Sequence, residues 1–201
     1  MKKLILILAA AMAMVWVASA SARHDFASWG KGNIAVYSNA AGTVMEPYVQ
    51  RAIENWELSG VNLDVRPTTD CSRRNGAIVL CVFNAWPGGG SSTTYRLHGN
   101  KLAYALVRVN AYLYENPLYE GGANPYYQGY EWDGTNYIVA GTWLPCHELG
   151  HALGLGHDNV HPSDPAYTEH QGCVNDYVRY PVPSPHDYTT LAGALTAGSR
   201  K

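Results

Sequence analysis

The apolar positions of the first half of the chain predict a strand, a helix and two further strands, in that order. Residues 34–37 are apolar and partly β-branched, as is typical of a short strand. Apolar residues then recur at helical spacing over 46–60, with Pro47 in the first turn and a glycine at the end. Residues 61–66 alternate as a strand does, and 77–83 form a nearly continuous apolar run, typical of a strand buried on both faces. This order predicts an α/β layer with a right-handed crossover.

The second half of the chain has a less regular pattern. Residues 92–97 are either an edge strand or an ordinary exposed loop, and 102–114 are a longer strand candidate. The segment 115–134 is rich in Tyr, Gly, Asn and Pro, and we expect a long ordered loop. Its tyrosines either pack over the sheet, which we favour, or line a substrate cleft. We expect one helix over 145–153 and a short helix that begins near Ser184.

The N-terminus predicts an export signal over residues 1–22. Two lysines precede an apolar run, 4–17, that is short for a membrane span, and small residues follow it. Cleavage after Ala22 is favoured, with Ala20 as the alternative. No cysteine follows the cleavage region to carry a lipid anchor. We therefore expect a secreted, extracellular protein without a membrane anchor, in which 23–201 form one catalytic domain.

Composition and charge narrow the function classes. A formal charge of −2 and a charged fraction of 15% argue against nucleic-acid binding and against a polybasic membrane surface. The chain is long enough for a single core, no internal repeat is present, and we expect a monomer. Four cysteines fit an oxidising compartment; three pairings are open in principle, and four reduced cysteines are the alternative.

The segment 147–157, with the sequence HELGHALGLGH, holds the candidate chemistry. His147 and His151 are four residues apart, so a helix places both imidazoles on one face, as two ligands of one metal require. Glu148 can reach a metal-bound water without being a ligand. Gly154 can end the helix in the left-handed conformation, which lets the chain return His157 as a third ligand. Three protein ligands leave one open position, the arrangement of a single catalytic zinc ion.

This run resembles the zinc signature of the metzincin metallopeptidases, and is most similar to matrixin-like secreted bacterial members. An HExxH match alone is common in surface helices, but here the glycine and the third histidine also match. The resemblance implies an α+β fold with an α/β-like upper subdomain, in which a twisted mixed sheet carries a backing helix and an active-site helix. A smaller, irregular C-terminal subdomain would end in a short helix, capped by Ser184 or Asp187.

The resemblance also implies a function. The protein would be a secreted zinc-dependent endopeptidase, in which Glu148 serves as general base for a zinc-bound water. An extended peptide or protein substrate would bind along 92–97 by β-augmentation. The alternative is a secreted zinc-holding peptide-binding module with little or no turnover. An intact Glu148 argues against that alternative, because a binding module needs no base there.

Three positions bear on how closely the chain follows the clan. Asp158 stands where matrixins carry Ser or Thr and adamalysins carry Asp, so the subfamily stays open. Metzincins place a methionine in a turn under the zinc; the matching segment here has Val174, which is smaller and is expected to leave slack below the histidines. Tyr177 is expected to donate a hydrogen bond to the developing oxyanion, although its offset from Val174 is one residue longer than in the clan.

Cys173 belongs to that same turn segment, so the resemblance favours a Cys146–Cys173 disulfide that pins the active-site helix to its floor. Cys71 and Cys81 would then close a local loop. Residues 133–136 offer oxygen ligands of the kind calcium takes, although short Asp/Asn/Gly turns are common without an ion. Animal matrixins hold a second, structural zinc, but no acidic partners accompany the single histidine in the matching region, so none is predicted. The histidines without ligand spacing are His24, His98, His161, His170 and His186.

Overall fold

A computed structural model describes residues 27–85, 91–112, 130–132, 137–139, 142–175 and 180–198. The expected signal segment 1–22, the part 115–129 of the expected tyrosine-rich loop, the expected calcium turn 133–136 and Tyr177 lie outside these residues. Among the described helices, none combines the length and the apolar character that a bilayer crossing requires.

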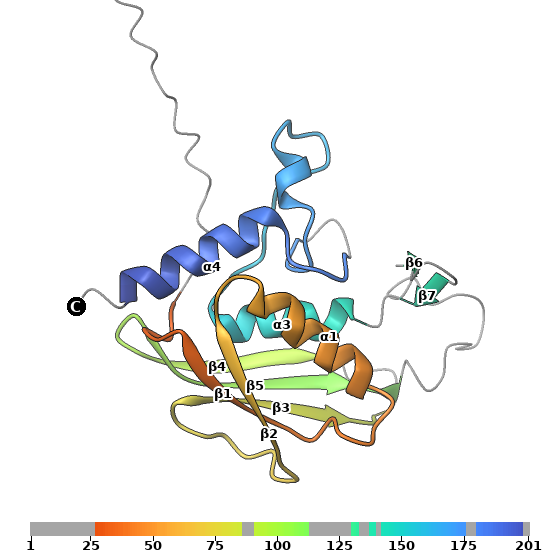
Figure 1. The fold of residues 1–201 in the computed structure, drawn as a ribbon, viewed down its shortest axis with the longest axis vertical. Helices are drawn as coiled ribbons and strands as arrows, with labels where there is room; N and C mark the ends of the chain where they lie inside the picture. Colours follow the sequence, from red (N-terminus) through yellow and green to blue (C-terminus); the bar gives the residue numbers. More distant parts are fainter. Residues whose placement is uncertain are drawn as a thin grey trace, which may run out of the picture.

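A mixed sheet of five strands is the base of the fold, in the order β2-β1-β3-β5-β4 (Figure 1). Neighbours run parallel, except that β4 runs antiparallel to β5. The central strand β3 is buried over all but its last residue, as its continuous apolar run predicts. The strands are β1 (Asn33–Ser38), β2 (Asn62–Pro67), β3 (Ala77–Phe83), β4 (Ser92–His98) and β5 (Lys101–Asn110).

Two helices lie side by side on one face of this sheet (Figure 1). The first is α1 (Glu46–Glu57), which has a proline in its first turn and buries an apolar stripe that includes Trp56. The second is α3 (Trp143–Leu153), which begins two residues before the predicted Pro145. The Trp56 indole donates a hydrogen bond to the Cys146 carbonyl oxygen at 2.9 Å, and so joins the two helices. This mixed sheet with its two helices is the α+β architecture that the sequence predicts.

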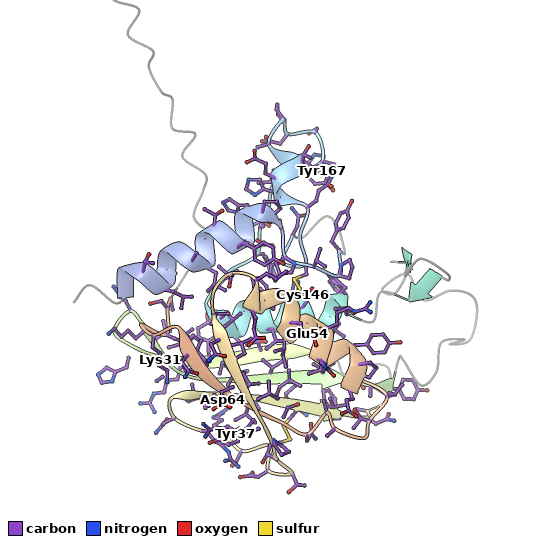
Figure 2. The ribbon with its side chains drawn as sticks, viewed as in Figure 1. Lys31, Tyr37, Glu54, Asp64, Cys146 and Tyr167 are labelled. Carbon is purple, nitrogen blue, oxygen red and sulfur yellow. A yellow bond between two sulfur atoms is a disulfide. The ribbon has the colours of Figure 1, made fainter. Side chains whose placement is uncertain are left out.

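The C-terminal part adds a 3-10 helix, η2 (Tyr167–His170), and a final helix, α4 (Pro185–Gly198). Figure 2 shows Tyr167 on the segment that extends away from the sheet, on the far side of the helix layer that carries Cys146. The sequence left the cap of α4 open between Ser184 and Asp187, and both take part. The Ser184 amide donates to Asp187 Oδ2 at 2.7 Å, and the Asp187 amide donates to Ser184 Oγ at 3.0 Å.

Two differences from the expected elements concern the middle of the chain. The strand predicted over 102–114 ends at Asn110. Part of the predicted loop 115–134 is wrong, because β6 (Tyr130–Trp132) pairs antiparallel with β7 (Tyr137–Val139). Strands of three residues are too short to show an alternating pattern of apolar and polar positions. The glycine- and asparagine-rich composition of the segment therefore led to the prediction of a loop.

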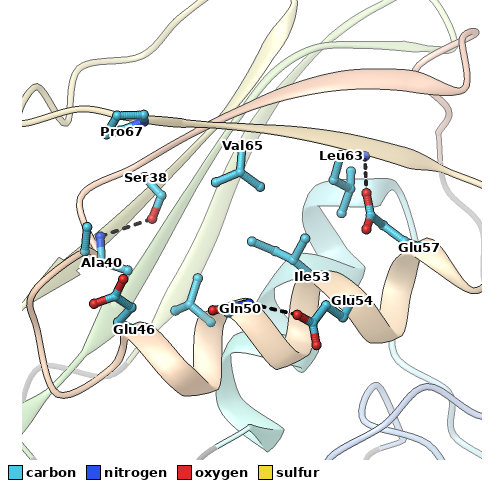
Figure 3. Close-up of a pocket in the computed structure, with 12 residues that line it drawn as sticks. Ser38, Ala40, Glu46, Gln50, Ile53, Glu54, Glu57, Leu63, Val65 and Pro67 are labelled. Atoms are coloured by element: carbon cyan, nitrogen blue, oxygen red, sulfur yellow. Dashed lines mark hydrogen bonds between the residues drawn. The ribbon is translucent and has the colours of Figure 1, made fainter.

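A hollow of about 430 Å³ lies between α1 and the β2 edge of the sheet, and shares no residue with the histidine segment (Figure 3). Its acidic side chains are engaged locally. Glu57 accepts a hydrogen bond from the Leu63 amide at 3.0 Å, and Glu54 accepts one from the Gln50 side chain at 2.9 Å. The hollow therefore belongs to the packing of α1 on the sheet edge, and we do not assign it a catalytic role.

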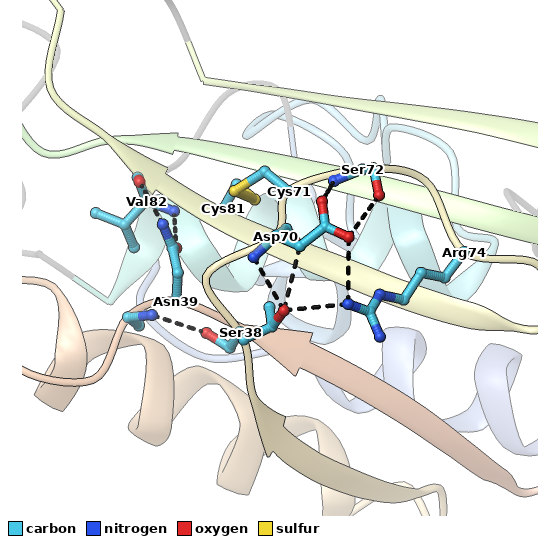
Figure 4. Close-up of a disulfide and its surroundings, with 10 residues drawn as sticks. Ser38, Asn39, Asp70, Cys71, Ser72, Arg74, Cys81 and Val82 are labelled. Carbon is cyan, nitrogen blue, oxygen red and sulfur yellow. Dashed lines mark hydrogen bonds and ion pairs between the residues drawn. A yellow bond between two sulfur atoms is a disulfide. The ribbon is translucent and has the colours of Figure 1, made fainter.

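A disulfide between Cys71 and Cys81 fastens the loop after β2 to strand β3 (Figure 4). The same loop is ordered by Asp70, whose carboxylate accepts hydrogen bonds from the backbone and the hydroxyl of Ser72, both at 2.8 Å. These bonds to Ser72 hold the pKa of Asp70 below its usual value. The loop is therefore held both covalently and by an Asx turn.

Candidate metal centre

Helix α3 and the turn after it bring three histidines together. His147 and His151 stand one turn apart, with their Nε2 atoms 3.1 Å from each other. Gly154 ends the helix with φ of 104°, a left-handed conformation that glycine adopts without strain. The chain then turns back, and one ring nitrogen from each of His147, His151 and His157 lies within 4.8 Å of the other two. The glycine turn and the return of the third histidine follow the expectation from the sequence.

Backbone carbonyls fix the orientation of the first two imidazoles. His147 Nδ1 lies 2.8 Å from the Cys173 carbonyl oxygen, and His151 Nδ1 lies 2.8 Å from the Leu155 carbonyl oxygen. A carbonyl can only accept, so each Nδ1 carries the proton and each Nε2 presents a lone pair. Two lone pairs that face each other at 3.1 Å repel unless a cation lies between them. The donor set therefore fits a zinc ion, which prefers imidazole nitrogen and tetrahedral geometry.

Glu148 lies beside this cluster but does not belong to it. Glu148 is only 6% exposed, and burial raises the pKa of its carboxyl group to about 7. A hydrogen bond from the Thr93 hydroxyl to Oε2, at 2.7 Å, acts in the opposite direction and lowers the pKa. A carboxyl group with a pKa near neutrality can both accept and release a proton, which general acid–base catalysis requires.

Thr93 is a residue that sequence reasoning missed. It stands on β4, and its hydroxyl oxygen also lies 2.8 Å from the Glu148 carbonyl oxygen. One hydroxyl hydrogen therefore has two acceptors on the same residue, the carboxylate and the backbone. No local pattern signals this contact, because the two residues are 55 positions apart.

If the chain hydrolyses peptide bonds as the sequence resemblance implies, replacing Thr93 with Val should slow that hydrolysis about tenfold, because a hydrogen bond to a charged group contributes roughly 1.5–3 kcal/mol. The pKa of Glu148 should rise, which moves the acidic limb of the rate profile to higher pH. The measurement is kcat against pH, with zinc content as the check on folding. Thr94→Val is the matched control, since Thr94 is the exposed neighbour on the same strand. Equal profiles for both variants would show that Thr93 does not position the carboxylate.

Val174 forms the floor under α3. It is fully buried, and its Cγ1 packs so closely on Gly150 that a Cβ atom there would overlap it. The same Cβ would lie 2.9 Å from the Trp56 ring. The gap that the sequence predicts below the histidines is therefore absent at Gly150. There the small side chain of Val174 packs against a residue that has no side chain.

The floor is covalently attached to the helix by a disulfide between Cys146 and Cys173. Both cysteines are fully buried, and the Cys173 carbonyl oxygen is the acceptor for His147 Nδ1. This is the pairing that the resemblance favours. The bond therefore holds the segment that orients the first histidine.

Removal of this disulfide by Cys146→Ala with Cys173→Ala should cost about 3.5 kcal/mol of stability, the loop-closure value for a separation of 27 residues. Zinc affinity should fall as well, because the acceptor for His147 is no longer held. The checks are denaturant unfolding and competitive zinc titration. Cys71→Ala with Cys81→Ala is the control: it should lose stability but keep zinc affinity. A similar loss of zinc affinity in both would contradict this local effect.

A second group of side chains escaped the sequence analysis. His170 and His186, which have no ligand spacing, lie with Asp158 so that one ligand atom from each is within 4.8 Å of the others. These three residues come from separate segments, and only the fold brings them together. His98, by contrast, is exposed at the end of β4 and belongs to neither group.

Comparisons with known proteins bear on the fold. No family model matches the chain, and no curated protein sequence is significantly similar to it. A chain of the GM1-bound ECX AB5 holotoxin superposes with a TM-score of 0.51 at 13% identity, over 86% of this chain and 84% of that one. Myroilysin superposes with a TM-score of 0.48 at 13% sequence identity, over 84% of this chain and 85% of that one. The third structure is high choriolytic enzyme 1, a hatching enzyme zinc-protease from Oryzias latipes (medaka fish). Its TM-score is 0.40 at 15% sequence identity, over 85% of this chain and 92% of that one. At such identities a likeness concerns the fold alone, and the first of these shows that this chain shares its overall fold with a chain of that holotoxin.

Proposed function

We propose that this protein is a zinc-dependent endopeptidase, secreted after removal of residues 1–22 and active as a single, monomeric catalytic domain. One observation carries the proposal: three histidine nitrogens converge in one side-chain cluster, and the residue that follows the first histidine, Glu148, has a buried carboxyl group outside that cluster. A structural zinc site is closed by its protein ligands, whereas this arrangement provides three ligands and a separate base. The matrixin-like character of the sequence signature supports the same reaction class.

Each of the proposed site residues has its own role in the reaction. His147, His151 and His157 would hold the ion, which when bound supplies a Lewis acid and a water of lowered pKa. Glu148 accepts the proton of the attacking water at its carboxylate and later delivers it to the leaving amine. We propose that Tyr177 donates a hydrogen bond to the oxygen of the tetrahedral intermediate.

The expected substrate is an extended peptide segment. Strand β4 lies at the end of the sheet order and packs against α3. Through Thr93, this strand also touches the carboxylate of the proposed base. A peptide that added to β4 as a further strand would therefore pass close to Glu148 and the three histidines, which supports β-augmentation as the binding mode.

The test is hydrolysis of a quenched protein substrate by the chain from residue 23 onwards. We expect cleavage that stops with a zinc chelator and returns when zinc is added back. A protein that binds zinc through the three histidines, yet cleaves none of a diverse set of substrates, would instead support a peptide-binding module. The sequence feature that favours that second candidate is Val174 in place of the clan's methionine, although Val174 leaves no gap at Gly150. Val174→Met would test whether turnover can be restored.

A further inference from the structure

Asp158, His170 and His186 form a cluster behind the histidine centre. Asp158 directly follows His157, His170 ends η2, and His186 lies in the first turn of α4. The side chains of Asp158 and His170 are 5% and 7% exposed, and that of His186 is 10% exposed. The two imidazole rings lie with their centroids 4.0 Å apart and their planes tilted by 31°.

Both imidazoles direct a nitrogen at the same carboxylate oxygen. His170 Nδ1 lies 2.5 Å from Asp158 Oδ2, and His186 Nδ1 lies 3.7 Å from it. The first distance is that of a short hydrogen bond, but the second is too long for one. A hydrogen bond between Asp158 and His170 therefore accounts for only part of the cluster. The ring of His186 adds a second nitrogen that faces the same oxygen.

We propose that these three side chains form a second metal site, for zinc or a similar transition-metal ion. Zinc bonds of 2.0–2.2 Å with tetrahedral angles place neighbouring ligand atoms about 3.3 Å apart. The two observed distances to the carboxylate oxygen, 2.5 and 3.7 Å, lie on either side of that value. All three ligand atoms lie within 4.8 Å of one another, so modest shifts of the side chains would be needed to seat an ion. Two imidazoles and one carboxylate favour zinc over calcium or magnesium, which prefer all-oxygen sites.

The consequence of such an ion is structural. It would join three segments that are far apart in sequence: the end of the zinc signature, η2 and the start of α4. The same segments are already linked to the floor of the histidine centre. The Asp158 amide donates to the Val174 carbonyl oxygen at 2.9 Å, and Asn175 Nδ2 donates to the His170 carbonyl oxygen at 3.1 Å. A bound ion would thus fix the residue next to His157 without sharing a ligand with the first site.

The experiment is a zinc count on the chain from residue 23 onwards after exhaustive dialysis, together with thermal unfolding. Wild type should hold about two zinc equivalents, as two separate sites of this ligand type require. His186→Gln and Asp158→Asn should each hold about one and melt several degrees lower, since a lost ligand of the folded state lowers its stability. His161→Gln, at an exposed histidine, should behave as wild type.

His147→Gln separates the two sites. If both exist, this variant also holds one equivalent, whereas combination with His186→Gln leaves none. A wild-type content of one, lost in His147→Gln and unchanged in Asp158→Asn, overturns the second site and leaves the proposed peptidase intact. If His186→Gln fails to fold, the wild-type count and Asp158→Asn, which keeps the side-chain shape, decide the question. A second equivalent that survives both His186→Gln and Asp158→Asn overturns the proposal, because it is then adventitious.

Discussion

Gly154→Ala is expected to lower the free energy of unfolding by about 4 kcal/mol and to abolish zinc binding. The left-handed backbone at Gly154, with φ of 104°, costs an alanine roughly 1–2 kcal/mol. The added Cβ would also overlap the Ala27 carbonyl oxygen and lie 2.9 Å from its carbon, and strain of this kind in a packed site costs a further ~1–3 kcal/mol. Backbone cannot move aside as a flexible side chain can. Relief would require the turn to open, and the turn is what returns His157 to the cluster.

Denaturant unfolding and zinc titration measure these two effects, and Gly60→Ala is the matched control. Gly60 has a similar φ of 87°, but no atom lies within 4 Å of the position of its missing Cβ. The control should therefore lose only the backbone part, ~1–2 kcal/mol, and keep its zinc. If Gly154→Ala were no worse than Gly60→Ala, the close approach of Ala27 would not constrain the zinc turn.

Glu148→Gln is expected to reduce kcat about 10³-fold while zinc content stays unchanged, because a general base contributes roughly 10²–10⁴ in rate. Glutamine has the same shape and can still hydrogen-bond to Thr93, so the ligand cluster should persist. The measurement is single-turnover hydrolysis beside metal analysis. Glu54→Gln, at an exposed position of α1, is the control and should retain full activity. Loss of zinc together with activity would instead assign Glu148 a role in holding the metal.

The same substitution should change how the stability of the metal-free protein depends on pH. The folded protein keeps the Glu148 proton up to about pH 7, whereas the unfolded chain releases it near 4.5. Between these values the folded state binds more protons, so the contribution of Glu148 to the free energy of unfolding is fully present below pH 4.5 and is lost as pH rises to about 7. The expected loss is about 3 kcal/mol, at ~1.36 kcal/mol per pKa unit. The difference in the free energy of unfolding between wild type and Glu148→Gln isolates this contribution. A difference that does not change between pH 4.5 and about 7 would refute it.

The parts of the protein that could be predicted from sequence are those set by local spacing. A pair of histidines four residues apart, a glycine that ends the helix and a third histidine form one short segment, so helix geometry alone places them. The buried run of β3 and the stripe of α1 are likewise periodic signals within a single element. Strand β4 was undecided between an edge strand and a loop, and the structure shows the edge strand.

The parts that could not be predicted depend on contacts between distant segments. Thr93 reaches Glu148 only because β4 ends the sheet beside α3. Asp158 meets His170 and His186 because η2 and α4 both return to the zinc turn. The fit of Val174 against Gly150 depends on side-chain volumes across two segments, and no pattern of polar and apolar positions encodes such a match.

The disulfide under α3 has a consequence for how the affinity for zinc depends on the redox state of the chain. The carbonyl that fixes the proton of His147 belongs to one of the two bonded cysteines. A chain whose thiols are still reduced lacks the bond that keeps this acceptor in place, and its first ligand is then not held in the tautomer that zinc needs. We therefore expect oxidation to raise the affinity of the chain for zinc. If the chain is the peptidase proposed above, its activity would then depend on the redox state of this cysteine pair, and a reduced chain would hold zinc less tightly.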